Sequence, residues 1–334
     1  MSADNPDTGR NPHETLRARG AAGRPANRYD RLRSEREHDG WDIPEEAPLL
    51  RTEITTEQPR SIITRNRSPD VPFDRSINPY RGCEHGCIYC FARPSHAYWG
   101  LSPGLDFETR ITAKPDAARL LEAEIARPSY RCAPIAFGTN TDPYQPAEAK
   151  LAIMPGLWRV LLDWNHPASL VTRGQTVLRD LPLLAEMAAR RLLHVGVSVT
   201  TLDAALARSL EPRAPAPSTR LRMIREMAGA GIPVRVMVAP VIPVLTEPDI
   251  EAILGAARDA GASHASMIPL RLPLEVAPLF RDWLSRNAPG RADYVMRRVK
   301  SMRGGRDNDP RFGHRMKGEG VEAELMLKRF RIAK

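Results

Sequence analysis

The chain has 334 residues, of which 42% are hydrophobic and 27% are charged, an ordinary balance for a soluble protein with one large or two small domains. No stretch approaches the roughly 20 uninterrupted apolar residues of a membrane helix, and the N-terminus lacks the apolar run of a secretory signal, so we expect a cytoplasmic protein without membrane contact. The formal net charge of +9 favours a polyanionic partner such as nucleic acid, although arginines on solvated helix faces explain it equally well.

Composition and hydrophobic periodicity divide the chain into three parts. Residues 1–60 mix arginine, acids, proline and glycine without a sustained period, which predicts a mostly disordered basic arm. Residues 61–290 predict the folded domain. Residues 291–334 begin with a glycine- and arginine-rich stretch and predict an irregular C-terminal extension that packs near one mouth of that domain.

Short apolar runs alternate with amphipathic segments throughout the predicted domain. The apolar runs predict strands at 75–80, 133–138, 168–172, 192–199, 233–239 and 263–268. The segments between them predict helices at 116–127, 155–165, 181–190, 218–230, 248–260 and 276–287. Six strand–helix units in this order imply an α/β fold with a parallel sheet and right-handed crossovers, either an incomplete (β/α)6 TIM-like barrel or a doubly wound sheet.

Three of the four cysteines, Cys83, Cys87 and Cys90, lie within eight residues in the spacing C-x3-C-x2-C. Gly82 and Gly86 allow the backbone to fold tightly around them. Soft thiolate ligands select an iron–sulfur cluster or zinc over hard cations. Three thiolates satisfy three irons of a four-iron cluster and leave the fourth open, which is a property of catalytic metal centres.

A structural zinc ion would need a fourth ligand, for which the candidates are His85, His96 and Cys132. Cys132 precedes the strand at 133–138, whereas the polar residues that we expect at the mouth of the fold follow that strand. At about 3.3 Å per strand residue, the two ends lie on opposite faces. We therefore predict that Cys132 neither binds the metal nor donates hydrogen.

With Tyr89 in the aromatic position, the motif C-x3-C-x-aromatic-C resembles the signature of radical S-adenosylmethionine (radical SAM) enzymes, and the resemblance covers residues 73–287. It implies an incomplete (β/α)6 barrel, a [4Fe-4S] cluster on the three cysteines, and S-adenosylmethionine bound at the open iron. In this family one electron cleaves the cofactor to methionine and a 5′-deoxyadenosyl radical, which abstracts hydrogen from the substrate. The electron implies a reductant of the flavodoxin or ferredoxin type.

The resemblance also implies cofactor-binding residues at the carboxyl ends of the strands, where parallel α/β folds place their sites. Residues after the second, third and fourth strands would bind the amino, carboxylate and ribose groups, and the backbone after the fifth would meet adenine. Taken singly, such residues are also common helix caps and turn formers. The predicted cofactor-binding residues are Tyr89, Thr139, Asn140, Thr141, Asp142, Thr172, Arg173, Ser198, Thr200 and Val241. Arg213 and Arg271 face either substrate or solvent.

The strings TDPYQPAE (141–148) and CIYCFARP (87–94) resemble the spore-photolyase-like group, whose named member repairs a thymine lesion in DNA. Spore photolyase carries a hydrogen-donating cysteine after the second strand, where this chain has residues 138–141 and no cysteine. Thymine-lesion lyase activity would then require a tyrosine donor, and the candidates are Tyr80, Tyr89, Tyr98 and Tyr144. Three hypotheses stay open: a radical enzyme acting on nucleic acid, one acting on a peptide or metabolite, and a zinc-bearing nucleic-acid module without catalysis.

Overall fold

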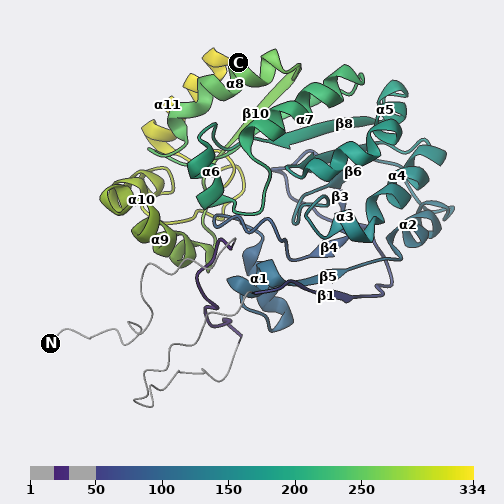
Figure 1. The fold of residues 1–334 in the computed structure, drawn as a ribbon, viewed down its shortest axis with the longest axis horizontal. Coiled ribbons are helices and arrows are strands. Elements are labelled where there is room, and N and C mark those ends of the chain that lie inside the picture. Colours follow the sequence, from purple (N-terminus) through teal and green to yellow (C-terminus); the bar gives the residue numbers. More distant parts are fainter. Residues whose placement is uncertain (1–18, 30–49) are drawn as a thin grey trace.

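The computed structural model describes residues 19–29 and 50–334 (Figure 1). Its centre is a seven-stranded sheet with the order β10-β9-β8-β7-β6-β3-β2. Six strands are parallel, and each pairs with the next of the six along the chain. They are β3 (Arg75–Ile77), β6 (Ile135–Phe137), β7 (Ala168–Thr172), β8 (Leu193–Ser198), β9 (Val234–Val241) and β10 (His264–Pro269). This is the strand order of an unclosed β/α barrel, and it confirms the predicted α/β fold and its six strands.

The six predicted helices are also present, and each follows its predicted strand. They are α2 (Ala117–Ile125), α4 (Ile153–Asp163), α5 (Leu181–Ala189), α7 (Pro217–Gly229), α8 (Ile250–Asp259) and α9 (Val276–Asn287). In Figure 1, α4, α5, α7 and α8 lie along the outside of the sheet. Their buried faces carry large side chains such as Trp158 and Met223, which are fully enclosed against Leu170, Val195 and Val236 of the strands. Burial of this apolar surface is the main stabilising contribution to the fold.

A second, three-stranded sheet flanks the cysteine loop, and the apolar runs of the sequence did not predict it. Its order is β1 (Glu53–Thr56), β5 (Arg110–Ala113) and β4 (Tyr80–Arg81). The predicted strand at 75–80 is therefore divided: β3 ends at Ile77, Pro79 cannot donate a ladder hydrogen bond, and β4 continues into the other sheet. The cysteine loop begins directly after β4.

Two parts of the chain differ from the expected irregular ends. Residues 19–29 and 50–60 belong to the predicted disordered arm, yet Arg19 and Ala21 are buried and β1 pairs with β5. The remaining residues of the arm lie outside the described residues. The C-terminal extension contains two helices, α10 (Ala292–Ser301) and α11 (Gly320–Ala333), joined by the irregular segment 302–319. The buried face of α11 carries residues that are three and four positions apart, the spacing of one side of a helix. They are Ala323, Met326 and Phe330.

The remaining elements are short connections. They are β2 (Thr64–Arg65), which is antiparallel to β3, η1 (Arg93–Trp99), α1 (Leu105–Thr109), α3 (Glu148–Leu151), η2 (Gln175–Asp180), α6 (Ala204–Leu210), η3 (Glu247–Asp249) and η4 (Pro289–Arg291). A second apolar cluster joins the cysteine loop to the C-terminal helices through Ile88, Phe280 and Val295. Among the described residues, no helix combines the length and the apolar character that a membrane span requires.

Candidate active site

The loop after β4 carries Cys83, Cys87 and Cys90 as free cysteines. The backbone turns back on itself twice, since the amide of Gly86 donates to the carbonyl of Cys83 and the amide of Cys90 donates to that of Cys87, at 3.4 and 3.2 Å. Gly82 and Gly86 both have positive φ, and a Cβ on Gly86 would lie 2.8 Å from a carboxylate oxygen. These two positions therefore require glycine.

A buried ion pair packs against the inner side of this loop and stabilises it. Nη2 of Arg93 lies 2.5 Å from Oε1 of Glu108, and both side chains are fully enclosed. The same guanidinium donates to four carbonyls, those of Gly86, Cys87, Pro103 and Gly104. Because its donors are used by backbone acceptors, Arg93 fixes the path of the loop as well as neutralising the carboxylate.

Residues 19–28, which we call the N-terminal strap, cross the outside of the loop. The amides of Gly20 and Ala21 each donate to the Glu108 carboxylate at 2.9 Å. Arg19 donates to the carbonyl of Glu108, and Arg24 pairs with Asp106 at 2.6 Å. A segment that the sequence placed in a disordered arm thus completes the hydrogen bonding of the carboxylate beneath the cysteine loop.

The three thiols lie on one loop and are near enough to influence one another's pKa. Burial raises the pKa of the Cys83 thiol, and the neighbouring Asp142 and Cys87 raise it further. Burial raises the pKa of Cys87 to about 12, although Arg173 opposes this shift. Without a cation, three thiolates here would repel one another in a medium of low polarity, whereas a metal centre bound to them removes that cost.

A buried polar cluster lies directly beside Cys87. The hydroxyl of Tyr89 donates to Glu211, and Thr200 donates to the same carboxylate at 2.9 Å. Arg173 and Arg220 both pair with Glu211, one with each oxygen. Burial alone would raise the pKa of Glu211, but the two guanidinium groups hold it at about 2, so the carboxylate is ionised.

Arg173 links this cluster to the cysteines. Its Nη1 lies 3.0 Å from Sγ of Cys87, 2.9 Å from the Tyr89 hydroxyl and 2.7 Å from Oε1 of Glu211. No hydrogen bond from Nη2 or Nε to any described residue is present, so these donors are available to a ligand. The structure therefore brings three of the predicted cofactor-binding residues together: Tyr89, Arg173 and Thr200.

The other predicted residues lie around this cluster in different roles. Asp142 accepts hydrogen bonds from Oγ1 of Thr172 at 2.6 Å and from the amide of Arg173 at 2.8 Å, and Nδ1 of His85 lies 3.4 Å away. Burial would raise the pKa of Asp142, but His85, Thr172 and Arg173 hold it at about 2. Asp142 thereby ties the end of β7 to the loop after β6 and to the cysteine loop.

Five predicted residues make other contacts. Thr141 donates to the carbonyl of Tyr80, and the carbonyl of Ser198 accepts from Arg220. Thr139 and Asn140 both contact the side chain of Asn78. The carbonyl of Val241 accepts from the amide of Leu270. None of these contacts involves a cysteine.

Sequence reasoning did not find Glu211 and Arg220, nor the pair Arg93 and Glu108. Glu211 and Arg220 flank a proline-rich segment, EPRAPAPSTR, in which a single acid is followed by two arginines. That local charge pattern was the available signal. The buried pair Arg93 and Glu108 has no such signal, because the partners come from different elements of unremarkable composition.

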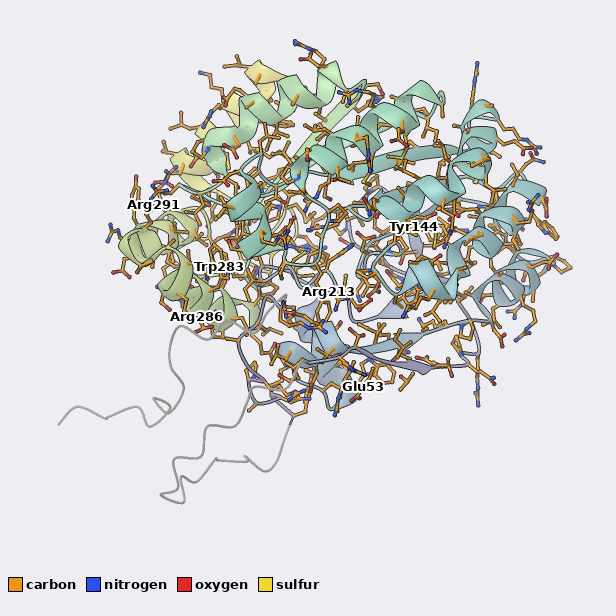
Figure 2. The ribbon with its side chains drawn as sticks, viewed as in Figure 1. Glu53, Tyr144, Arg213, Trp283, Arg286 and Arg291 are labelled. Carbon is orange, nitrogen blue, oxygen red and sulfur yellow. The ribbon has the colours of Figure 1, made fainter. Side chains whose placement is uncertain are left out.

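Two arginines of undetermined role lie close to the loop. Arg213 is labelled in Figure 2. Its Nη2 lies 3.1 Å from Glu84, a buried residue of the cysteine loop, and its Nη1 lies 3.5 Å from Thr52. Arg271 stacks on the exposed ring of Phe91 at 4.2 Å. Burial and the charges of Arg315 and Arg303 lower the pKa of Arg271 to about 10. Both arginines therefore place positive charge at the edge of the site.

Two of the candidate fourth ligands for a zinc ion lie close to other groups of the protein. His85 is directed to Asp142, and Nε2 of His96 lies 3.1 Å from the carbonyl of Arg110. Cys132 is exposed and precedes β6, whereas the predicted site residues follow it. The prediction that Cys132 takes no part in the site stays a prediction.

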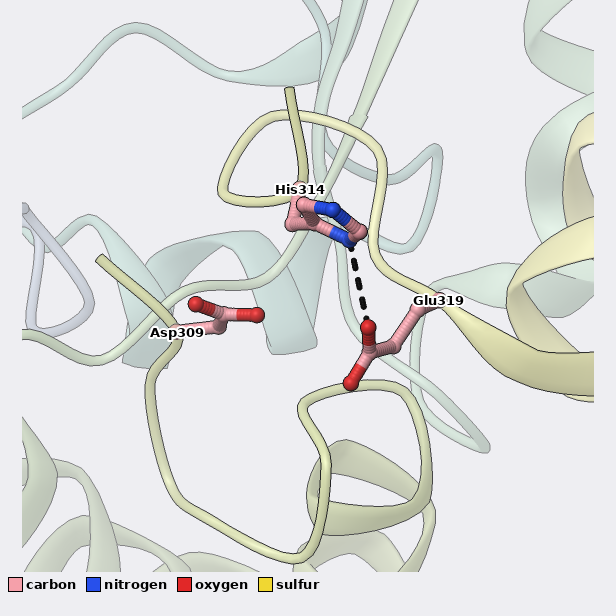
Figure 3. Close-up of side chains that lie close together, drawn as sticks. All are labelled: Asp309, His314 and Glu319. Carbon is pink, nitrogen blue, oxygen red and sulfur yellow. Dashed lines mark ion pairs between the residues drawn. The ribbon is translucent and has the colours of Figure 1, made fainter. Parts of the chain in front are cut away.

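A separate group of possible ligands occurs in the C-terminal segment, where Asp309, His314 and Glu319 approach one another (Figure 3). Nδ1 of His314 lies 3.1 Å from Oε2 of Glu319. The guanidinium of Arg311 already pairs with both carboxylates, at 2.6 and 2.9 Å. Charge pairing within the chain thus satisfies this group, and we assign no metal to it.

Comparison with known proteins places these observations in a family. A family model of the radical SAM superfamily matches residues 77–257, more than half of the chain. An uncharacterized protein of Mycobacterium tuberculosis is 42% identical over 221 residues, covering 66% of this chain and 65% of the relative. One of Methanocaldococcus jannaschii is 23% identical over 218 residues, covering 64% and 76%. The match thus spans just under two thirds of the mycobacterial relative.

Solved structures show the same fold. Spore photoproduct lyase complexed with dinucleoside spore photoproduct superposes with a TM-score of 0.59 at 15% identity, covering 84% of this chain and 78% of the lyase. A double mutant of that lyase with bound AdoMet and the same dinucleoside gives 0.51 at 16% identity, covering 70% and 65%. With the family match, the loop of three cysteines and the unclosed barrel lead to one conclusion: this chain belongs to the radical SAM superfamily.

Proposed function

We propose that this protein is a radical SAM enzyme that holds a [4Fe-4S] cluster on Cys83, Cys87 and Cys90. The observation that carries the proposal is the presence of three free cysteines on one loop, two of them buried, next to an arginine that contacts Cys87. When bound, such a cluster supplies one electron and an open iron, by which S-adenosylmethionine is cleaved to methionine and a 5′-deoxyadenosyl radical.

The residues of the chain would bind and orient the cofactor. Arg173 has two free donors on a guanidinium that suits the methionine carboxylate, and Glu211 holds that guanidinium in place. The hydroxyls of Thr200 and Tyr89 both donate to Glu211 and so help to hold the residue that positions Arg173. Asp142 fixes the backbone from which Arg173 extends. Tyr89, Thr200 and Glu211 are buried, and this shielding from bulk water would protect a reactive radical from side reactions.

We further propose that the substrate is nucleic acid. The formal charge of +9 supports this, as do the arginines that stack on exposed aromatic rings near the loop, such as Arg271 on Phe91. The lyase with the similar fold was solved with a dinucleoside photoproduct bound. No cysteine follows β6 in this chain, so the step that returns hydrogen to a substrate would use another group, such as the hydroxyl of a tyrosine.

The cofactor chemistry is tested with protein purified and reconstituted without oxygen. We expect iron and sulfide in a ratio of four each per chain if the cluster is complete. After reduction by dithionite or a flavodoxin, we expect 5′-deoxyadenosine from S-adenosylmethionine by liquid chromatography. Alanine at Cys83, Cys87 or Cys90 should abolish both signals, whereas Cys132→Ala should retain both. Stoichiometric zinc without 5′-deoxyadenosine would refute the proposal and support the non-catalytic module.

The substrate class is tested by adding single-stranded and damaged double-stranded DNA, RNA and a peptide mixture to the reduced enzyme. Turnover should make 5′-deoxyadenosine formation faster in the presence of nucleic acid, and binding should weaken as salt rises because phosphate contacts release counterions. Stimulation by the peptide mixture alone would overturn the nucleic-acid assignment but leave the cofactor chemistry intact.

A further inference from the structure

A cavity of about 340 Å³ opens beside the cysteine loop. Its walls come from the ends of β3 and β6, from β4, from η1 and from the residue after β5. The lining side chains that carry the argument are Asn78, Arg81, Trp99, Lys114, Thr139 and Asn140. None of these residues contacts Glu211 or a cysteine through a side-chain hydrogen bond in the described part of the chain.

The cavity holds more positive charge than its surroundings neutralise. Nζ of Lys114 donates to the carbonyl of Asn78 at 3.0 Å, and no ion pair joins it to any carboxylate among residues 19–29 and 50–334. Nη2 of Arg81 pairs with Glu57 at 2.6 Å, but its Nη1 is buried and meets no hydrogen-bond partner within those same ranges. Buried donors without acceptors are costly, so an anionic ligand would stabilise this arrangement.

The electrostatics agree with that geometry. Burial lowers the pKa of Lys114, and the neighbouring charge of Arg81 lowers it further. Two cations that disfavour one another are a common arrangement in a phosphate site, because the ligand then removes both the repulsion and the unsatisfied donors.

An exposed aromatic ring stands at the rim of the cavity. The guanidinium carbon of Arg81 lies 3.4 Å from the centre of the Trp99 ring, and 58% of Trp99 is exposed. The preceding residue, Tyr98, is 69% exposed, and the centre of its ring lies 5.7 Å from the centre of the Tyr29 ring. The guanidinium of Arg28 lies over both rings. Exposed aromatic rings alternating with arginines form the stacking surface that unpaired bases use.

We propose that this cavity binds one nucleotide of a single-stranded nucleic acid, with a phosphate on Lys114 and Arg81 and the base on Trp99. Asn78, Thr139 and Asn140 line the same cavity, and polar side chains of this kind can meet the polar edge of a base. This deepens the nucleic-acid part of the proposed function and rests on it. Thr139 and Asn140 would then contact the substrate, although the sequence placed them on the cofactor.

A free nucleotide offers the same chemistry as a nucleotide within a strand, and binding measurements separate these two sources. The cluster-loaded protein is titrated without oxygen against fluorescein-labelled single-stranded DNA and RNA, with AMP, inorganic phosphate and S-adenosylmethionine as unlabelled competitors. Lys114→Gln should weaken oligonucleotide binding by on the order of tenfold, the effect of losing one charged hydrogen bond. It should also make the slope of log affinity against log salt shallower by about 0.7.

Trp99→Leu tests the contact with the base separately from the contact with the phosphate. It should weaken oligonucleotide and AMP binding by about fivefold or more through lost stacking, while leaving competition by inorganic phosphate unchanged. Trp99→Phe should recover part of the affinity. Lys328→Gln removes the same charge from an exposed position on α11 and should change neither binding nor the yield of 5′-deoxyadenosine. Iron content and melting temperature verify that each variant is folded and loaded.

The outcomes distinguish this proposal from the proposed function. Equal binding by the wild type, Lys114→Gln and Trp99→Leu overturns the cavity assignment, whatever the cleavage assay gives. If oligonucleotides bind weakly while AMP binds tightly and depends on Lys114, the cavity binds a free nucleotide. That result overturns the proposal that it binds a nucleotide within a strand. A loss of S-adenosylmethionine binding in Lys114→Gln equal to the loss of oligonucleotide binding would make the cavity part of the cofactor site and also overturn the proposal. Absence of 5′-deoxyadenosine in the wild type refutes the radical chemistry alone.

Discussion

Nη1 of Arg173 lies 3.0 Å from Sγ of Cys87, so a guanidinium directly after β7 contacts the second cysteine of a loop that lies 86 residues earlier in the sequence. The pair joins the part of the chain that would hold the cluster to the part that would hold the cofactor. It makes Arg173 the residue whose replacement is most informative about cofactor binding.

Arg173→Lys keeps a positive charge but loses the planar pair of donors that a carboxylate accepts. We expect the KM for S-adenosylmethionine in the uncoupled cleavage reaction to rise by about tenfold or more, since a charge-assisted hydrogen bond is lost. Steady-state assays of 5′-deoxyadenosine check this, with Arg190→Lys on the exposed end of α5 as the control. An unchanged KM at full iron content would show that Arg173 does not bind the cofactor.

Gly86→Ala forces a side chain into a backbone with φ of +68° and against the Glu108 carboxylate. We expect a loss of about 1–3 kcal/mol in the free energy of unfolding, together with poor cluster loading. Gly255→Ala, in the interior of α8 with open space around it, should instead stabilise by about 0.5–1 kcal/mol. Urea unfolding and iron analysis measure both effects, and equal stability of the two variants would contradict the tight-turn assignment.

Glu108→Gln preserves the shape of the side chain and leaves Arg93 as a buried charge without a counter-ion. We expect the protein to lose about 3–5 kcal/mol of stability, as is usual when one member of a buried pair is removed. The exposed pair of Arg119 and Asp116 provides the comparison, because Asp116→Asn should cost at most about 0.5 kcal/mol. Thermal unfolding distinguishes the two, and a small effect at Glu108 would mean that the loop does not depend on this pair.

His166 predicts a dependence of stability on pH. Burial lowers its pKa below the ordinary value of 6.5, and Arg75 lowers it further, while its Nε2 meets the Tyr130 hydroxyl at 2.8 Å. The unfolded chain therefore binds the proton more readily, so the contribution is complete above about pH 6.5 and is lost as the pH falls below it. His166→Gln should reduce the difference in urea midpoint between about pH 7.5 and about pH 5.5. An identical difference in both proteins would show that His166 is not responsible.

The six strand–helix units were predictable because buried parallel strands leave continuous apolar runs, such as residues 168–172, which coincide with β7. The cysteine loop was predictable because its ligands are neighbours in sequence. Strands β1, β4 and β5 were not predictable, because β1 is wholly exposed and β4 has two residues. Their pairing is decided by tertiary contacts, which leave no period in the sequence.

Glu211 shows the corresponding limit for the site. It lies 121 residues after Cys90 in sequence, yet it accepts a hydrogen bond from the Tyr89 hydroxyl and pairs with the guanidinium groups of Arg173 and Arg220. The charge pattern around it, one acid followed by two arginines, does not by itself mark it as buried. A residue whose role depends on partners from three different elements becomes visible only when the chain is folded.

The N-terminal strap determines where the protein can be shortened. A truncation that began at residue 61 would keep every predicted strand, helix and cysteine, yet it would remove the amides of Gly20 and Ala21 and leave the Glu108 carboxylate with two empty acceptor positions inside the molecule. The structural unit around the cysteine loop is therefore discontinuous in sequence. It includes residues 19–28 together with the barrel, and we expect a protein shortened to the barrel alone to be less stable.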